Sequence, residues 1–221
     1  MRVVVSEFMS LDGVVQAPGG PEEDLDGGFA HGGWSMPLFD PEVMGAAVGA
    51  KFATVEALLF GRRTFTVMAD AWPERAGDPF ADQMNEVQKY VVTDTLSQDD
   101  ITWPNSHVIP VAQAIDAIAE LRAKDGGDLG IFGSPTLVRA LLAADLVDEL
   151  NVMIEPVLLG GGKRIFTDDG VGRPLELVDV QVASTGVLVC TYRPTGEPLA
   201  TGHSDELYED PADPPVPSTE G

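Results

Sequence analysis

Short apolar segments alternate with amphipathic segments along most of this 221-residue sequence. The runs "VVVSEFMSL" (3–11), "ALLFG" (57–61) and "LGIFG" (129–133) are typical of strands, and the last two are apolar throughout. Strands without polar alternation are buried on both faces, as in parallel sheets covered by helices. Strands that alternate with helices predict a three-layer α/β domain with a mostly parallel sheet.

The segments between these strands carry helix signals. "SPTLVRALLAADL" (134–146) begins with Ser134, a candidate N-cap, followed by proline, and Asp40 precedes Pro41 at the start of an alanine-rich segment (41–57) in the same way. Further helices are expected over 79–88 and 111–127, and a further strand over 89–94. At the end, residues 174–194 read as two strands joined by a turn at 184–186, and this antiparallel hairpin makes the sheet mixed.

Composition limits the classes of function. The chain has 13 Lys+Arg against 36 Asp+Glu, a net charge of -23, which excludes a nucleic-acid-binding protein because a polyphosphate needs a basic face. The single cysteine and three scattered histidines provide no disulfide and no metal-ligand spacing. No apolar stretch approaches the roughly 20 residues that span a bilayer, and none resembles a signal peptide. We therefore expect a cytoplasmic protein with no membrane partner.

The last part of the sequence differs from the rest. Residues 194–221 are rich in proline, glycine and acidic residues and show no apolar period. Such a segment buries too little surface to offset its ordering entropy. We expect one domain over residues 1–193 and a flexible tail over 194–221, the alternative being a lid or a strap that binds a partner.

Three strand-to-helix junctions read "FGRRTF" (60–65), "VTDTL" (92–96) and "FGSPTL" (132–137). Ligands of open α/β sheets bind beyond the carboxyl ends of the strands. Glycines, two arginines and a helix N-terminus gathered there would suit a polyanion, such as a dinucleotide with an extra phosphate. Alternatively, Arg62 and Arg63 pair with the many acidic residues, Thr64 and Ser134 cap helices, and the domain is purely structural.

The order of "SEFMSLDGVVQAPGG", "LLFGRRTF", "KYVVTDTL" and "GIFGSPTLVRALLAADLVDELNVMIEPVLLGGGKRIF" resembles the dihydrofolate-reductase-like superfamily. The motifs are most similar to proteins related to the C-terminal reductase domain of the bifunctional riboflavin-biosynthesis deaminase-reductase. The resemblance covers residues 1 to about 193. It implies an α/β fold that binds NADPH across the strand ends and transfers a hydride to a heterocyclic or carbonyl substrate, and it implies a homodimer.

The resemblance assigns cofactor-binding roles at the three junctions to Gly61, Arg62, Arg63, Thr64, Thr93, Gly133 and Ser134. It places the arginines of "GRRT" at the phosphate on the adenosine ribose and the threonine as a cap of the helix beneath the pyrophosphate. It places Thr93 near the adenosine, and the turn with Gly133 against the pyrophosphate. The two adjacent arginines would then form a local positive pocket in an otherwise repulsive field.

Site residues for the substrate follow from the same resemblance. Asp12, in the turn after the first strand, either orients the substrate or caps the turn. The glycine-rich segment 16–40 resembles the substrate-covering loop of the family, and within it His31, Trp34 and Phe39 are candidate substrate-binding residues. Asp40 is a candidate catalytic carboxylate as well as a candidate N-cap.

These observations favour an NADPH-dependent reductase of a small heterocyclic or carbonyl compound. By motif similarity the substrate resembles the riboflavin precursor 5-amino-6-(5-phosphoribosylamino)uracil. The alternative is a non-catalytic protein that binds a nucleotide or another ligand on the same fold.

Overall fold

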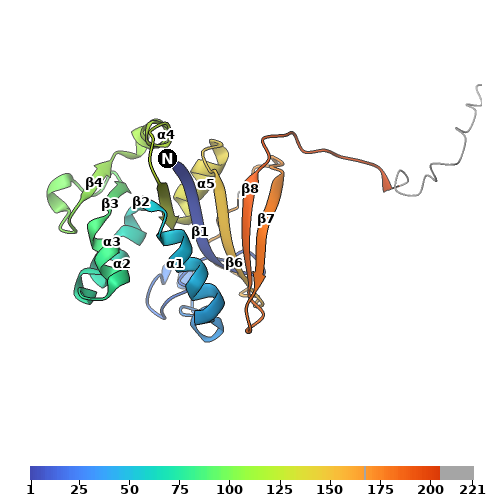
Figure 1. The fold of residues 1–221 in the computed structure, drawn as a ribbon, viewed down its shortest axis with the longest axis horizontal. Helices are drawn as coiled ribbons and strands as arrows, with labels where there is room; N and C mark the ends of the chain where they lie inside the picture. Colours follow the sequence, from blue (N-terminus) through green and yellow to red (C-terminus); the bar gives the residue numbers. More distant parts are fainter. Residues whose placement is uncertain (167, 205–221) are drawn as a thin grey trace, which may run out of the picture.

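The computed structural model describes residues 1–166 and 168–204, which form an eight-stranded sheet with helices on both faces (Figure 1). Along the sheet the strands lie in the order β4-β3-β2-β5-β1-β6-β8-β7. Their bounds are β1 Arg2–Ser10, β2 Val55–Gly61, β3 Gln88–Val92, β4 Ser106–Ile109, β5 Asp128–Phe132, β6 Glu149–Glu155, β7 Leu175–Val182 and β8 Leu188–Pro194. In the order along the sheet, all strands from β4 to β6 are parallel to one another, so their carboxyl ends lie at one edge of the sheet.

The helices of the described residues connect these strands. They are α1 Ala46–Phe52, α2 Arg62–Ala71, α3 Pro79–Glu86, α4 Ala114–Arg122 and α5 Pro135–Ala143. A wider π-type turn, Pro41–Gly45, runs directly into α1. Short 3-10 turns lie at Asp26–Gly28, Met36–Leu38, Pro73–Arg75, Gln98–Asp100 and Val111–Gln113.

Strand β2 shows how the three layers form. Leu59 belongs to the apolar core that contains Ile118 of α4, on one face of the sheet. Its neighbour Leu58 belongs to a different core, which contains Phe65 of α2. Because successive side chains of a strand point to opposite faces, the apolar run over β2 needs helices on both sides. The structure provides them, and the expected three-layer arrangement is confirmed.

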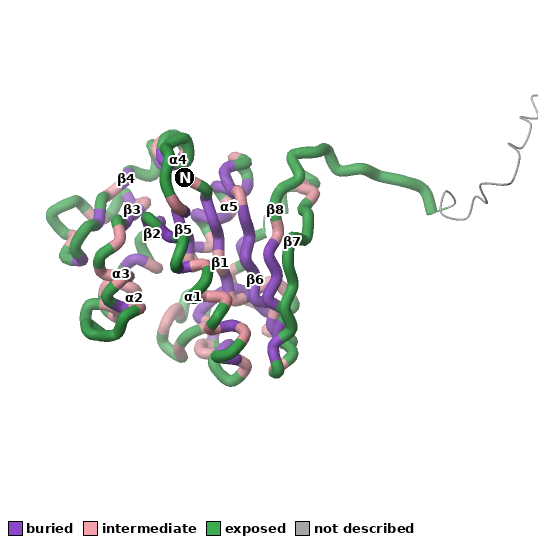
Figure 2. Tube along the Cα trace, viewed as in Figure 1, coloured by how far each residue is buried: buried purple, intermediate pink, exposed green. Residues whose placement is uncertain are grey.

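The hairpin formed by β7 and β8 lies at one end of the sheet, next to β6, and was expected from the sequence. Both pairings of β8 are antiparallel, and the turn between the two strands contains Gly186 at φ 86. The sheet is therefore mixed, which confirms the expected fold class. Every residue of β7 is exposed, and Figure 2 shows this strand in green at the edge of the sheet.

Some boundaries differ from the sequence-based expectations. The helix expected over 41–57 ends at Phe52 because Val55 already starts β2. Strand β4 was not expected, since its four residues carry little apolar signal. Of the tail expected over 194–221, residues 195–204 are exposed and residues 205–221 lie outside the described part. Among the described residues there is no helix with the length and apolar content that a membrane crossing requires.

Candidate functional site

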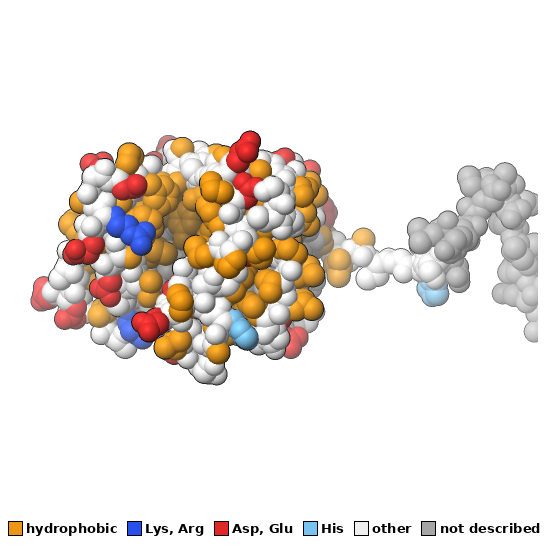
Figure 3. All heavy atoms as spheres, turned by 90° about the horizontal axis from the view of Figure 1, so that it is seen from below, with side chains coloured by type: hydrophobic (Ala, Val, Ile, Leu, Met, Phe, Trp, Pro, Cys, Tyr) orange, Lys and Arg blue, Asp and Glu red, His pale blue; other side chains and the backbone are white. Residues whose placement is uncertain are grey.

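A cleft of about 1610 Å³ extends from the edge of the sheet where the parallel strands end, across the sheet, to Lys51 and Arg193 near the start of β6. Its wall is built from β1, the loop after β1, helices α1 and α2, the turn between β5 and α5, and strands β6, β7 and β8. Figure 3 looks onto this edge of the molecule, and apolar side chains line the hollow visible there. This is the place where open α/β sheets bind ligands.

The two adjacent arginines lie in the wall of this cleft, at the start of α2. Arg63 forms an ion pair with Asp26 and lies 3.7 Å from Asp24, both in the loop after β1. Arg62 forms no ion pair with any residue that the structure describes. The alternative in which both arginines pair with acidic residues therefore holds for one of them, and the other offers its guanidinium to the cleft.

The first and third junctions pack directly on each other. The Ser134 hydroxyl accepts a hydrogen bond of 2.8 Å from the Gly61 backbone N–H. A Cβ atom added to Gly133 would lie 3.1 Å from Thr64 Cγ2, closer than most such contacts. The structure thus brings Gly61, Thr64, Gly133 and Ser134 together at the cleft. A side chain at Gly133 would push the turn after β5 away from the start of α2.

The expected helix caps at this place are wrong. Ser134 precedes α5 with φ 65 and ψ 56 and makes no cap hydrogen bond, because its hydroxyl is turned toward Gly61. Thr64 is the third residue of α2 rather than its N-cap, and Gly61 holds the N-cap position without a side chain. No side chain of the described residues caps α2 or α5. The first-turn N–H groups of α2 therefore have no side-chain acceptor and remain free for an anion at the cleft. At α5 only the Thr136 N–H is left for one, because Pro135 has no N–H and the Leu137 N–H bonds the Ser134 carbonyl at 2.9 Å.

Glu7 is a cleft residue that the sequence analysis missed. It lies near the carboxyl end of β1, is 6% exposed, and forms part of the cleft wall. Its Oε1 atom has no hydrogen-bond partner among the described residues. Burial raises the pKa of Glu7 to about 8, although a backbone hydrogen bond from Gly133 acts in the opposite direction. The carboxyl group therefore carries its proton at neutral pH. A glutamate within the run "VVVSEFM" was the available signal, because an acidic residue in a buried strand is unusual.

Asp12 lies outside the cleft wall and ties the turn after β1 to residues 157–164. Its carboxylate accepts hydrogen bonds from Ser10 Oγ at 2.6 Å and from the N–H groups of Leu159 and Gly160 at 3.1 and 2.9 Å. The bond from Ser10 is the main reason that its pKa falls to about 2. These contacts are those of a turn cap, and a catalytic role for Asp12 stays a prediction.

Asp40 is the N-cap of the turn that leads into α1. Its Oδ1 accepts hydrogen bonds from the N–H groups of Glu42 and Val43, and its Oδ2 accepts two from Ser184, at 2.9 and 2.6 Å. The side-chain bond from Ser184 is the largest cause that lowers the pKa of Asp40 to about 2. Asp40 is also absent from the cleft wall. The expected N-cap is confirmed, and its catalytic role stays a prediction.

The remaining candidates are spread over three places. Phe39 lies in the cleft wall and packs against Phe8 of β1 at a ring distance of 6.3 Å. His31 lines a separate cavity of about 640 Å³. Trp34 donates its indole N–H to the Gln16 carbonyl at 2.8 Å, outside the cleft wall. Thr93 is buried, and its hydroxyl accepts the Thr95 N–H at 3.1 Å. Of these four, the structure places only Phe39 at the cleft.

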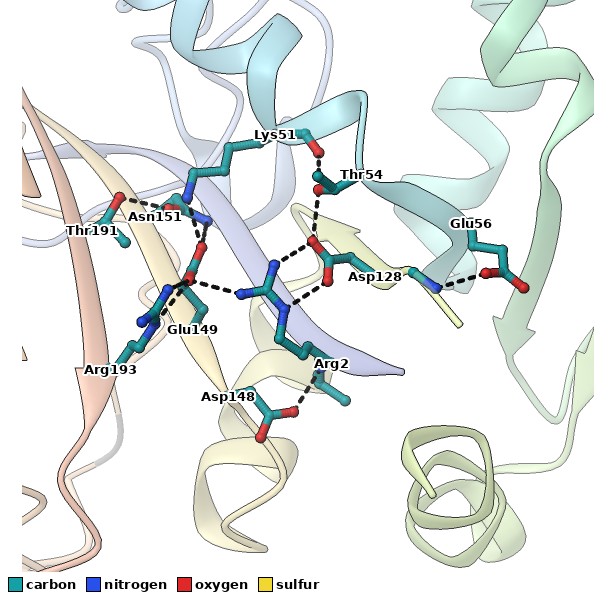
Figure 4. A network of polar contacts seen from close by, with 12 residues as sticks. Arg2, Lys51, Thr54, Glu56, Asp128, Asp148, Glu149, Asn151, Thr191 and Arg193 are labelled. Atoms are coloured by element: carbon teal, nitrogen blue, oxygen red, sulfur yellow. Dashed lines mark hydrogen bonds and ion pairs between the residues drawn. The ribbon is translucent and has the colours of Figure 1, made fainter. Parts of the chain in front are cut away.

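A network of charges lies where β1, β6 and β8 adjoin α1 (Figure 4). Glu149, 1% exposed, accepts contacts from Lys51 at 2.6 Å and from Arg193 at 2.9 Å, and both cations line the cleft. Arg2 bridges Glu149 and Asp128. Burial raises the pKa of Glu149, but the hydrogen bonds from Lys51 and Arg193 outweigh burial and hold it below its usual value. The cations of this network are already paired with carboxylates.

A second buried carboxyl group of raised pKa holds the segment 16–40 to the sheet. Glu155, at the end of β6, accepts a hydrogen bond of 2.5 Å from Ser35 Oγ. Burial raises its pKa to about 7, and the bond from Ser35 opposes this shift. Glu155 does not line the cleft. Among residues 1–166 and 168–204, no group of three or more His, Cys, Asp or Glu side chains could hold a metal ion.

Comparisons with known proteins agree with this fold. The Bacillus subtilis (strain 168) protein YyaP, whose name describes it as uncharacterized, is 24% identical over 200 residues, which cover 88% of this chain and 96% of YyaP. A solved structure from Shewanella sp. PV-4, named for riboflavin biosynthesis, superposes with a TM-score of 0.66 at 22% identity and covers 88% of this chain and 99% of that one. Dihydrofolate reductase from Enterococcus faecalis, complexed with NADP(H), gives a TM-score of 0.54 at 19% identity, covering 88% and 96%.

The likeness to the solved structures establishes a dihydrofolate-reductase-like fold. Because the sequence identity is low, it establishes the fold alone. The family is established by the sequence itself. The RibD C-terminal domain matches residues 1–189, which include the strands β1 to β7 and the first two residues of β8. The chain belongs to the RibD C-terminal domain family.

Proposed function

We propose that this protein is an NADPH-dependent reductase that transfers a hydride to a small heterocyclic or carbonyl compound. The observation that carries the proposal is the pair of interlocked turns at the cleft. Gly61 and Ser134 join them by a hydrogen bond, and both helices that follow begin without a side-chain cap. Such helix starts favour phosphate groups.

The arginines complete this cradle for a dinucleotide. Arg62 has no carboxylate partner in the described part of the chain, and Arg63 faces the same cleft. Arg62 would hold the phosphate on the adenosine ribose, since a guanidinium matches phosphate with two hydrogen bonds. Arg63 would join it by exchanging its partner Asp26 for the phosphate. A net charge of -23 repels anions at long range, so affinity depends on cations concentrated at this point.

The cleft is suited to the chemistry as well as to binding. The bound dinucleotide supplies the hydride. The apolar wall, with Phe39 and Phe8 among its residues, excludes water from the substrate and orients a planar ring. Glu7 places a protonated carboxyl group in this wall, and that feature favours a reductase over a protein that only binds a nucleotide.

The relatives support the choice of cofactor and substrate class. The Enterococcus faecalis dihydrofolate reductase, which has the same fold, is a complex with NADP(H). The family is named after a riboflavin-biosynthesis protein, and a solved structure of similar fold is named as a 5-amino-6-(5-phosphoribosylamino)uracil reductase with a deaminase. We therefore propose a substrate related to that aminouracil.

The proposal is tested by titrating the protein with NADPH and NADH while following tryptophan fluorescence. We expect NADPH to bind much more tightly than NADH, and Arg62→Ala to reduce the affinity for NADPH while leaving that for NADH almost unchanged. Arg139→Ala, in α5 and absent from the cleft wall, is the control variant. Equal binding of NADPH by wild type and Arg62→Ala would show that the phosphate does not lie at α2. If neither NADPH nor NADH binds, the proposal of a reductase is refuted. NADPH oxidation with a panel of pyrimidines and carbonyl compounds then identifies the substrate.

A further inference from the structure

The order of strands locates Glu7 relative to a bound dinucleotide. Arg62 follows β2, Ser134 follows β5, and Glu7 lies on β1, and these strands are neighbours in that order. Neighbouring strands lie about 4.8 Å apart. If the adenosine phosphate lies at β2 and the pyrophosphate at the junction of β2 and β5, the nicotinamide half reaches β1. This assignment of positions rests on the proposed function.

The surroundings of Glu7 leave one of its oxygen atoms without a hydrogen-bond partner among the described residues. The Gly133 backbone N–H, in the neighbouring turn, acts on the carboxyl group and lowers its pKa. The residue opposite on β6 is Val152, which has no polar side chain. The Oε1 atom, buried and without a partner among the described residues, belongs to a residue of the cleft wall. A buried acceptor left without a partner is costly, and such groups occur where function requires them.

We infer that Glu7 is the proton donor of this cleft, acting on the substrate beside the nicotinamide ring. When the reduced nicotinamide gives its hydride to one atom of a substrate double bond, the π bond breaks and its electron pair moves to the second atom. The proton of Glu7 forms the new bond at that second atom. Glu7 is left as a carboxylate and regains a proton from water that enters the open cleft after the product leaves.

Other carboxyl groups fit this role less well. Asp12 and Asp40 have a lowered pKa and accept several hydrogen bonds, so they hold no proton at neutral pH. Glu155 bonds Ser35 and lies outside the cleft wall. Glu23 lines the cleft, but its Oε2 accepts the Gly19 and Gly20 N–H groups at 2.7 and 3.1 Å. Glu7 alone among these groups combines a protonated state with an oxygen atom that has no partner and a place in the wall.

Glu7 next to the nicotinamide ring has a consequence that can be measured without a substrate. The oxidised ring carries a positive charge, and the reduced ring carries none. An opposite charge within about 4–6 Å lowers the pKa of a carboxyl group by about 1–3 units. NADP⁺ therefore favours ionised Glu7, and its affinity should rise with pH as Glu7 ionises. NADPH favours the protonated form and should not gain affinity.

The experiment measures the affinities of NADP⁺ and NADPH between pH 6 and pH 9 and follows their ratio. The phosphate groups of the two cofactors titrate alike, so the ratio cancels them. It also cancels the other charged groups of the cleft to the extent that they act equally on both cofactors; these are Glu22, Glu23, Asp24, Asp26, Lys51, Arg62, Arg63, Arg75, Lys163, Asp179 and Arg193. For wild type we expect the ratio to shift toward NADP⁺ by about tenfold or more across this range.

Three variants show whether Glu7 or another carboxyl group causes the pH dependence of the affinity ratio. Glu7→Gln keeps the shape of the side chain but cannot ionise, and it should remove the pH dependence of the ratio. Glu155→Gln removes the other buried carboxyl group of raised pKa, outside the cleft, and should leave the dependence unchanged. Glu23→Gln should keep the dependence but move it to lower pH, because the charge of Glu23 raises the pKa of Glu7.

A measurement on wild type alone guards against a variant that fails to fold. With a pH indicator dye at about pH 7.5, binding of NADP⁺ should release protons, and binding of NADPH should not. If both cofactors bind but the ratio is independent of pH, or if it changes equally in wild type and Glu7→Gln, the role of Glu7 is refuted while the reductase stands. If neither cofactor binds, the proposed function itself fails. With any compound that wild type reduces, Glu7→Gln should lose about 10²–10⁴-fold in kcat.

Discussion

Replacing Glu7 by glutamine should stabilise the folded protein at neutral pH. Glu7 has a pKa of about 8 in the folded chain, against an ordinary value of 4.5. Below pH 4.5 both the folded and the unfolded chain hold the proton, so Glu7 adds no dependence on pH. As the pH rises from there to about 8, ionisation favours the unfolded chain, and the free energy of unfolding falls by about 1.4 kcal/mol for each pH unit. Near pH 7 this loss amounts to about 3 kcal/mol.

The assay is urea unfolding of wild type and Glu7→Gln at several values of pH from 5 to 8. The difference in the free energy of unfolding between the two proteins should grow with pH, since groups common to both cancel. A constant offset from the new amide would not alter this slope. Glu155→Gln is the control, whose slope should end near pH 7, the raised pKa of Glu155. Identical pH dependence in wild type and Glu7→Gln would refute the reasoning, because it would show that Glu7 is ionised in the folded protein.

Two further predictions concern the turns and caps. Gly133→Ala should destabilise the protein by more than the roughly 1–2 kcal/mol cost of a left-handed residue and should weaken NADPH binding, because the new Cβ meets Thr64; Gly27→Ala, at φ 66 with open space around it, is the control in unfolding and titration experiments. Asp78→Ala should lose about 1 kcal/mol of stability as the N-cap of α3, and Asp40→Ala should lose more, because its carboxylate also accepts two hydrogen bonds from Ser184. A much larger loss of activity in Asp40→Ala than in Asp78→Ala would instead restore a catalytic role for Asp40.

The sequence indicated most of the architecture because the apolar runs matched single strands. It also indicated the junctions that meet at the cleft, since glycine and hydroxyl residues after neighbouring parallel strands must share one edge of the sheet. Gly61 and Ser134 are indeed in contact, although they are 73 residues apart. The cap expected for Ser134 failed because its hydroxyl bonds another turn, and local sequence cannot reveal that competition.

The missed features depend on contacts between distant segments. Nothing near Glu7 in the sequence shows that β5 and β6 enclose it, so its raised pKa could not be inferred. The pairing of Arg63 with Asp26 depends on how the loop after β1 folds over α2. Asp12 and Asp40 attracted attention as carboxylates beside the expected site, yet they hold a turn and a helix start to distant segments. Asp12 accepts bonds from Leu159 and Gly160, and Asp40 accepts two from Ser184.

The exposed strand β7 has a consequence for how copies of this chain behave in solution. An edge strand presents unpaired backbone N–H and C=O groups that can pair with a strand of another chain. Exposed apolar side chains such as Leu177, Val180 and Val182 would stabilise this pairing. Glu176 and Asp179 interrupt this strand with like charges, and the net charge of -23 adds repulsion between copies. The acidity of the protein thus protects its own sheet edge. At physiological ionic strength, salt screens the repulsion between charges that are more than about 8 Å apart, and higher salt shortens this distance. Asp179→Val at high salt should therefore turn β7 into a site of irreversible aggregation.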